Sequence, residues 1–165
     1  MARFLTIGYG DRAGYDGTAG VVEVWPVDWL RTRLEVRRGV RGHTGWNGDA
    51  GFDLIRTGNR WDVSIGPRVG FGDARYLSTY FGVTPAEAAA NPLIDRPYTP
   101  EKGRRYTGLQ TAVGYQLTDH WRTTVDFAYR RLADRAVRSP IVRTSGSGDY
   151  FTGGVGLRYS FGIGR

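Results

Sequence analysis

The sequence contains no cysteine and only one lysine, Lys102, and it has no long hydrophobic run. Without cysteine, neither a disulfide framework nor a thiolate metal site can form. A membrane-spanning helix needs roughly 20 consecutive apolar residues, and a chain with 24 % charged residues and a mean hydropathy of −0.41 offers no such segment. A helical membrane protein is therefore excluded. A membrane barrel is not, because its strands hide polar residues in the interior.

Groups suited to catalysis or metal binding are also scarce. His43 and His120 are the only histidines, and the sequence has neither a G-x-S-x-G nucleophile motif nor a nucleotide-binding glycine motif. Its Asp- and Gly-rich turns lack the ligand spacing of a calcium loop. We therefore expect no catalytic residue, no cofactor and no metal, in a protein that is not an enzyme.

Glycine and aromatic residues are abundant, with 25 glycines and 13 % Phe, Trp and Tyr. Curved, twisted strands use both, whereas helices accommodate them poorly. The net charge of +7 is carried almost wholly by arginine. Basic chains often bind nucleic acid, but these arginines recur on one side of the expected strands and form no continuous run. We expect no nucleic-acid partner, and anionic lipopolysaccharide or peptidoglycan suits the charge as well.

Alternation of apolar with small or polar residues predicts the strands. It is clearest where Leu109, Val113 and Leu117 alternate with Gly108 and Gln110. The same pattern recurs in residues 61–71, 121–130 and 151–161, and more weakly in residues 4–9, 18–25, 30–37 and 46–54. The total is about eight strands.

The expected connections alternate in length. Short turns fall at residues 26–28, 57–59 and 118–119, and longer loops at residues 10–17, 38–45, 73–104 and 132–148. Short turns at one end and long loops at the other are typical of an outer-membrane barrel. We predict an all-β fold, an antiparallel up-and-down transmembrane β-barrel of about eight strands, as a single domain over residues 1–165. The first nine residues lack the charged and apolar regions of a signal peptide. Either the export signal has been removed from this chain, or the start is truncated, or the protein is not in the outer membrane.

The loop over residues 73–104 contains one predicted helix. Thr84 and Glu87 form the pattern of a capping box with Pro85 at the first helical position, and Asn91 followed by Pro92 ends the segment. We therefore expect one short helix in a long extracellular loop, as a lid, a recognition surface or an ordered loop without a partner.

The two faces of the strands differ in character. The apolar face carries aromatic residues near strand ends, namely Trp61, Trp121, Tyr129, Tyr159 and Phe161, as in the girdles at a membrane boundary. The other face is charged. With Glu23, it collects Arg31, Arg33, Glu35, Arg37, Asp49, Asp53, Asp62, Arg68, Arg122, Asp126, Arg130 and Arg158.

An eight-stranded barrel is only wide enough for side chains to fill it, and buried charges must be paired. We therefore expect a salt-bridged plug in the lumen. An arginine-lined path for anions is the alternative and needs a wider barrel. A soluble barrel, with the apolar face inward around a small molecule, is a further alternative.

Residues 78–89 resemble the Y-F-G-V-T-P-x-x-A-A signature of the MipA/OmpV family. The motif residues are Tyr80, Phe81, Gly82, Val83, Thr84 and Pro85. Further matches follow in family order at residues 98–100, 114–121, 139–142 and 156–161, and residues 42–45 resemble the family's G-H-x-G turn. The resemblance covers most of the chain, and the Y-F-G-V-T-P run is specific.

The resemblance implies an outer-membrane barrel without catalytic residues. One member of the family is described as a scaffold that links a lytic murein transglycosylase to a penicillin-binding protein, and others as porin-like or adhesive proteins. It thus implies contact with outer-membrane lipid and lipopolysaccharide, and with a murein hydrolase and synthase. Gly156, Tyr159 and Phe161 fit the aromatic-ended last strand that the barrel-assembly machinery recognises. Family members usually have a signal peptide and further N-terminal strands, so this chain is a fragment, begins at a miscalled start, or is a reduced barrel that still closes.

Three functional hypotheses follow. The leading one is a non-enzymatic scaffold in the outer membrane, linked by the resemblance to murein synthesis and hydrolysis. The second is a narrow porin or a surface adhesion protein, and the third is a soluble β-barrel that binds a small molecule.

Overall fold

The computed structural model describes residues 17–39 and 45–161. Their main feature is a single sheet of seven strands in chain order, each antiparallel to the next. The strands are β1 (Gly17–Val27), β2 (Leu30–Gly39), β3 (Trp46–Thr57), β4 (Trp61–Gly72), β5 (Gly103–Gln116), β6 (Trp121–Leu132) and β7 (Asp149–Tyr159). The predicted all-β, antiparallel, up-and-down arrangement is therefore confirmed.

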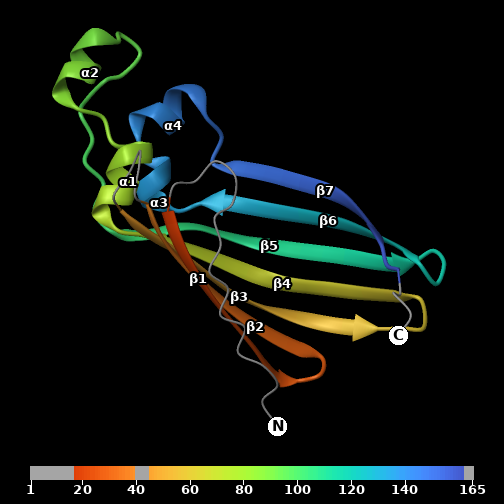
Figure 1. Cartoon of the computed structure of the whole chain (residues 1–165). Coiled ribbons are helices and arrows are strands. Elements are labelled where there is room, and N and C mark those ends of the chain that lie inside the picture. The colour runs from red at the N-terminus through yellow and green to blue at the C-terminus, as the bar shows by residue number, and fades with distance from the viewer. Residues whose placement is uncertain (1–16, 40–44, 162–165) are drawn as a thin grey trace.

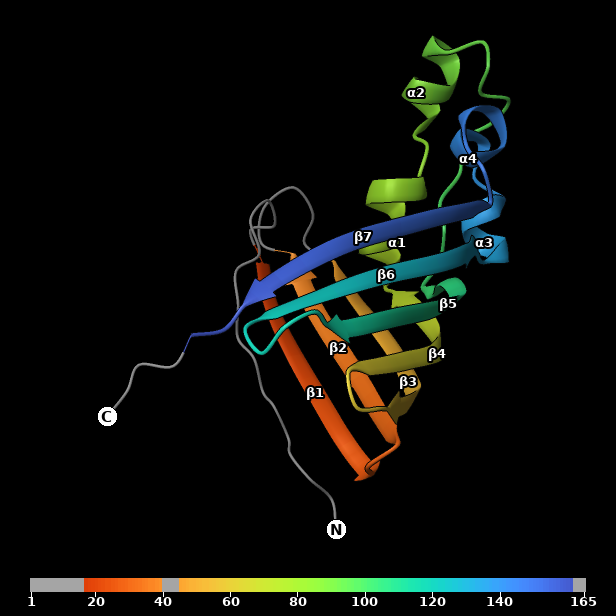
Figure 2. The same cartoon turned by 90° about the vertical axis from the view of Figure 1, so that its right-hand side faces the viewer.

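The sheet is twisted and curled into a trough, as Figures 1 and 2 show from two directions. Seven strands are described where we expected about eight, and the strand expected at residues 4–9 lies outside the described residues. Among the residues that the structure covers, no pairing joins β1 to β7, so the sheet is not closed there. The closed barrel is thus not established by the fold and remains a prediction.

The connections differ in length at the two ends of the sheet (Figure 1). The short turns are residues 28–29, 58–60 and 117–120. The longer connections are residues 40–45, 73–102 and 133–148. Of these, residues 40–44 lie outside the described part of the chain. The alternation of short turns and long connections follows the sequence-based prediction.

The expectation of one short helix was wrong, because the described parts of the long connections contain four. The helices are α1 (Ala74–Phe81), α2 (Pro85–Ala90), α3 (Asp134–Val137) and α4 (Pro140–Ser145). The predicted helix is α2, and its capping box between Thr84 and Glu87 is present. Helix α1 was missed although Asp73 accepts a hydrogen bond from the Tyr76 amide as its N-cap (2.7 Å), since its helical pattern is only two turns long.

We call residues 73–102 and 133–148 the helical cap. It lies at one end of the trough in both views (Figures 1 and 2) and contains most of the buried apolar side chains, including Leu77, Val83 and Ala136. No helix in the described ranges has the length and apolar character needed to cross a membrane. The ordinary hydrophobic core of this chain therefore lies in the cap, beside the sheet.

The outer, convex face of the sheet is apolar and exposed. Val113, Val125 and Phe127 are each between 44 % and 51 % exposed, and Val155 on β7 is 79 % exposed. Soluble proteins rarely leave an apolar surface of this extent uncovered. The sheet is thus inverted relative to a soluble sandwich, with apolar residues outside and charged residues inside.

Candidate functional site

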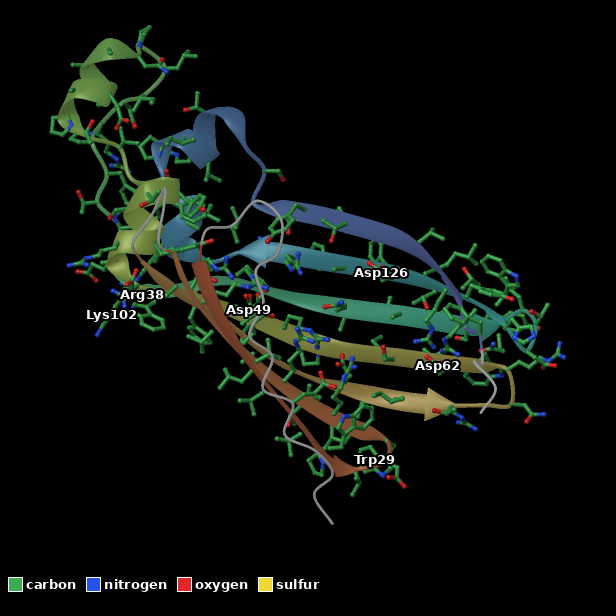
Figure 3. All side chains as sticks on the ribbon, in the orientation of Figure 1. Trp29, Arg38, Asp49, Asp62, Lys102 and Asp126 are labelled. Atoms are coloured by element: carbon green, nitrogen blue, oxygen red, sulfur yellow. The ribbon has the colours of Figure 1, made fainter. Side chains whose placement is uncertain are left out.

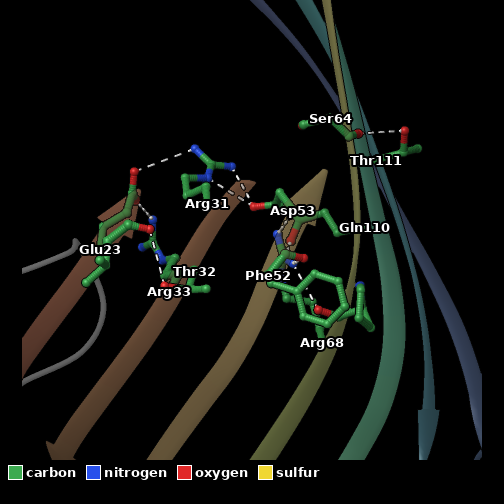
Figure 4. Close-up of polar contacts among 12 residues, drawn as sticks. Glu23, Arg31, Thr32, Arg33, Phe52, Asp53, Ser64, Arg68, Gln110 and Thr111 are labelled. Carbon is green, nitrogen blue, oxygen red and sulfur yellow. Dashed lines mark hydrogen bonds and ion pairs between the residues drawn. The ribbon is translucent and has the colours of Figure 1, made fainter. Parts of the chain in front are cut away.

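The concave face of the trough is built from charged side chains, and Asp53 on β3 is at its centre. Asp53 is 1 % exposed and accepts hydrogen bonds from Arg31 on β2 (3.0 and 2.8 Å) and from Arg68 on β4 (2.6 Å). Arg68 also donates to Gln110 on β5 (3.2 Å). Figure 4 shows this chain of contacts across four neighbouring strands. One buried carboxylate therefore holds together arginines from the strands on either side of it.

Glutamates continue the network toward β1. Glu23 on β1 lies 3.8 Å from Arg31 and 3.5 Å from Arg33, and Glu35 lies 3.3 Å from Arg33 and 2.5 Å from Arg37. Arg37 in turn approaches Asp49 at 3.8 Å. These pairs run along the cross-strand register in which Glu23 faces Arg33 and Glu35 faces Asp49. The structure thus joins the charges of β1, β2 and β3 into one cluster.

Asp49 forms the end of the cluster nearer the cap. It accepts a hydrogen bond from Arg105 (2.8 Å) and one from the Tyr106 hydroxyl, and Arg105 also donates to the Tyr76 hydroxyl of α1 (2.8 Å). Arg105 and Tyr106 are consecutive, yet both reach the concave face, because the pairing of β4 with β5 is irregular beside Gly70. Strict alternation assigns only one of two neighbours to each face, so Arg105 could not be predicted to lie on the concave face.

Gly70 allows Tyr106 to lie flat against the sheet. A Cβ atom at position 70 would stand only 2.3 Å from the Tyr106 ring, so a larger residue cannot be accommodated there without displacing the ring. The covering of a glycine by an aromatic ring of the neighbouring strand helps to fix sheet register. Tyr106 is buried as a result.

The charged residues enclose a hollow of about 410 Å³. Its lining is mostly charged and aromatic, together with Ala50 and Gly51, and consists of Arg31, Arg33, Glu35, Arg37, Asp49, Arg68, Arg105, Tyr106, Gln110, Arg130 and Tyr150. Its lining comes from six strands, β2 to β7, so it is the floor of the trough. A hollow of this size is within the usual range of small-molecule sites.

Four other predicted lumen residues lie apart from the cluster. Asp62 and Arg122 form an ion pair near the short turns. Asp126 and Arg158 are exposed and have no ion-pair partner within residues 17–39 and 45–161. Arg130 also lacks a carboxylate there and stacks between the rings of Tyr106 (5.2 Å) and Tyr150 (5.9 Å). In Figure 3, Asp49 lies nearer the cap, and Asp62 lies toward the short-turn end. The structure thus places all twelve predicted residues on the concave face and pairs nine of them.

Aromatic side chains occupy the ends of the outer face. Near the short turns, the Trp121 ring lies 4.8 Å from that of Tyr159, and Trp61 is opposite Tyr115 in the register. Near the cap, Tyr129 lies 5.1 Å from Phe151. The predicted aromatic residues are therefore in two rows, one toward each end of the strands.

The six motif residues Tyr80 to Pro85 join α1 to α2 within the cap. Tyr80 and Phe81 end α1, Gly82 caps it through its N–H to the Ser78 carbonyl (2.9 Å), and Val83 is buried. Thr84 and Pro85 begin α2. Hydrogen bonds from the Thr84 amide (2.8 Å) and hydroxyl (2.7 Å) lower the pKa of the Glu87 carboxyl. The motif thus encodes a helix end and a helix start.

The motif also docks onto the second half of the cap. The Phe81 carbonyl accepts a hydrogen bond from the fully buried Ser139 hydroxyl (2.7 Å), and Val83 pairs with Tyr98, whose hydroxyl donates to the Arg135 carbonyl (2.6 Å). These contacts connect the β4–β5 and β6–β7 connections. The resemblance alone gave no indication of this role.

The predicted assembly signal is at the last described strand. Gly156 faces Thr124 in the register, and Tyr159 and Phe161 expose half or more of their surface. His120 lies beside them, with its ring 5.7 Å from Tyr159 and its Nδ1 atom 3.1 Å from the Ser160 carbonyl. Within the described ranges no group of three or more acidic or histidine side chains could hold a metal ion. His43 and the turn at residues 42–45 fall at least partly outside those ranges.

Comparison with protein families decides the relationship. A model described as MltA-interacting protein MipA matches residues 4–161. The chain belongs to the MipA family. No curated protein and no solved structure matches it in the same comparisons. Membership confirms the resemblance and makes the chain a murein-related protein of the cell envelope.

Proposed function

We propose that this MipA-family chain forms the wall of an outer-membrane β-barrel and acts there as a non-enzymatic scaffold of the cell envelope. The observation that carries the proposal is the inverted sheet, with an exposed apolar outer face and a charged concave face. In lipid the outer face is covered by acyl chains, and the charges inside pair with one another. The strands contain 10 to 14 residues, and about 9–11 are enough to cross a bilayer.

The same arrangement, with apolar residues outside and charged residues inside, argues against a soluble β-barrel that binds a small molecule. A soluble barrel with a small-molecule site needs an apolar interior and a polar exterior. Here the interior hollow is lined by arginines and carboxylates, and the exterior carries Val113, Val125 and Phe127. The membrane placement is the arrangement that leaves neither set of residues in an unfavourable environment.

The family description supports a murein-processing partner. An MltA-type murein hydrolase is the partner that the name MltA-interacting protein indicates, and a murein synthase is the second one that the scaffold hypothesis requires. In the predicted orientation the cap is extracellular, and the short turns at residues 28–29 and 58–60, which would face the murein, offer little area for docking. The murein partner is therefore proposed from the family description alone. Purified MltA-type hydrolase should be retained by the full chain in detergent, and a chain without residues 73–104 shows whether the cap takes part.

The membrane proposal is tested by folding. The full chain, diluted from urea into detergent micelles or lipid vesicles, should acquire β structure and migrate differently on gels before and after boiling. Migration that never changes with heating, together with a monomeric folded state in buffer without detergent, would contradict the proposal.

A narrow porin is the second candidate, since six arginines line the hollow. A conducting pore would give steps of current in planar bilayers, whereas a lumen filled by paired charges would give none. The ion pairs that join β1 to β5 favour a non-conducting lumen, in which the hollow is a pocket between paired charges.

A further inference from the structure

The hollow on the concave face has more positive than negative charge. Six arginines and two carboxylates line it. Asp53 and Glu23 lie beside the hollow and form ion pairs with three of its arginines, namely Arg31, Arg33 and Arg68. Counting these two residues raises the number of carboxylates to four. Within residues 17–39 and 45–161, two arginines are therefore in excess over the carboxylates that could neutralise them. Buried or half-buried cations that exceed their counter-charges favour an anionic ligand.

The excess is concentrated at Arg130. Its guanidinium lies between the rings of Tyr106 and Tyr150, and no carboxylate within the described residues forms an ion pair with it. The Nε atoms of Arg130 and Arg105 are both buried and have no hydrogen-bond partner there. Buried donors are nearly always satisfied in native proteins, so these two guanidinium groups have hydrogen-bonding capacity that the described residues leave unused, and Arg130 is the lining arginine without a carboxylate partner among them.

We propose that the hollow around Arg130 binds a small solute that carries a phosphate group. A guanidinium binds phosphate through paired N–H groups in a planar fork, and a phosphate dianion matches the excess of two positive charges. The hollow of about 410 Å³ is far larger than one anion and suits a ligand of monosaccharide size or more. The tyrosine rings beside Arg130 provide flat walls for the uncharged part of such a solute.

This inference rests on the proposed membrane barrel, because the hollow lies on the face that the barrel would enclose. The apolar outer face is on the opposite side of the same strands. A free solute in the trough therefore meets Arg130 on the concave face, whereas a lipid headgroup at the outer face lies on the opposite side of the sheet.

The test is a binding titration on the full chain folded in detergent micelles. The probes are inorganic phosphate and glucose 6-phosphate, with glucose as the uncharged comparison, and the readouts are tyrosine and tryptophan fluorescence and calorimetry. We expect both phosphates to bind, glucose not to bind, and affinity to fall as salt is added. Micelles doped with phosphatidylglycerol separate the two sources of phosphate. If phosphatidylglycerol competes with the phosphate probes, the site binds a lipid headgroup. If it does not compete, the site binds a free solute.

The variant Arg130→Gln should weaken phosphate binding by about tenfold or more, as the loss of a charged hydrogen bond predicts. Arg131→Gln is the matched control, since Arg131 is the next residue, points outward and has a side chain that is 70 % exposed. If Arg130→Gln fails to fold, Arg33→Gln replaces it, because the Arg33 side chain lines the hollow and is 37 % exposed.

Two results overturn the inference. One is a folded, heat-modifiable chain that binds neither phosphate, which leaves the barrel proposal intact. The other is an equal loss of binding in Arg130→Gln and Arg131→Gln, which reduces the effect to general surface charge. A chain that never folds in detergent contradicts the barrel and this site together.

Discussion

At the scale of single residues, Asp53 is the most deeply buried charge of the concave face. Both of its oxygens are used, one by Arg31 and the other by Arg68. Removing one partner from a buried ion pair costs more than the pair contributes, because the remaining charge loses its compensation. Asp53 therefore holds β2 and β4 to β3 on the inner side of the sheet.

The variant Asp53→Asn should lower the free energy of unfolding by about 3 kcal/mol. The amide cannot neutralise Arg31 and Arg68, and both would be left charged in the trough. Asp126→Asn is the control, since Asp126 faces the same trough but is exposed and should change stability little. Urea unfolding in lipid vesicles, followed by tryptophan fluorescence, measures both. Equal stability of the two variants would show that the network does not hold the strands.

Ionisation of Glu87 makes the stability of helix α2 in the cap depend on pH. Because hydrogen bonds from the amide and the hydroxyl of Thr84 lower the pKa of Glu87, the ionised carboxylate is the form that stabilises the start of α2. This contribution is complete above the ordinary pKa of glutamate and is lost as the pH falls through the lowered value.

The carboxyl carbon of Glu87 can be titrated by NMR in the full chain. We expect a pKa below the ordinary value of 4.5, and a return toward that value in Thr84→Ala. Amide exchange in α2 should quicken only at the acid end of the titration. An unchanged titration curve in Thr84→Ala would show that the capping box does not form.

At the scale of elements, the cap is one unit made of two distant connections. Ser139 before α4 donates to the carbonyl of Phe81 at the end of α1, and the Tyr98 hydroxyl donates to the carbonyl of Arg135 in α3. The family motif thus fixes the helix junction on which the other half of the cap rests. A weakened junction should loosen the cap without opening the sheet.

Ser139→Ala should destabilise the docking of α4 on α1 by about 1 kcal/mol, because the Phe81 carbonyl loses its buried donor. Limited proteolysis should then cut residues 133–148 faster, while heat-modifiable migration of the whole chain is retained. Thr144→Ala serves as control, since its bond to the Leu93 carbonyl is exposed. Equal cleavage of the wild-type chain and Ser139→Ala would contradict the proposed junction.

The strands could be predicted from the sequence because one alternation runs through each of them, as in residues 106–117. The capping box at Thr84 is equally local and predicted α2 correctly. The bulge beside Gly70 could not be predicted, because it places Arg105 and Tyr106 on the same face. The pairing of Asp53 with Arg31 and Arg68 depends on the register of three strands, which no single segment specifies. Helix α1 is too short for its period to stand out.

At the scale of the whole molecule, the two faces of the sheet impose opposite requirements on their surroundings. On the concave face most charged side chains form ion pairs with one another, and the hollow there is lined by more arginines than carboxylates. The outer face has no covering from the described protein and ends in two rows of aromatic residues. A bilayer is the surrounding that fits both faces, and the cap then lies in water at one end.

The proposed contact of the outer face with acyl chains can be tested directly, because the sequence contains no cysteine. Single cysteines at residues 123 to 128 of β6, each carrying a nitroxide label, can be examined by electron paramagnetic resonance in lipid vesicles. We expect high oxygen accessibility at Thr123, Val125 and Phe127 and low accessibility at the intervening positions. Equal accessibility along the strand, or greater exposure of the odd positions to a water-soluble nickel chelate than to oxygen, would contradict it.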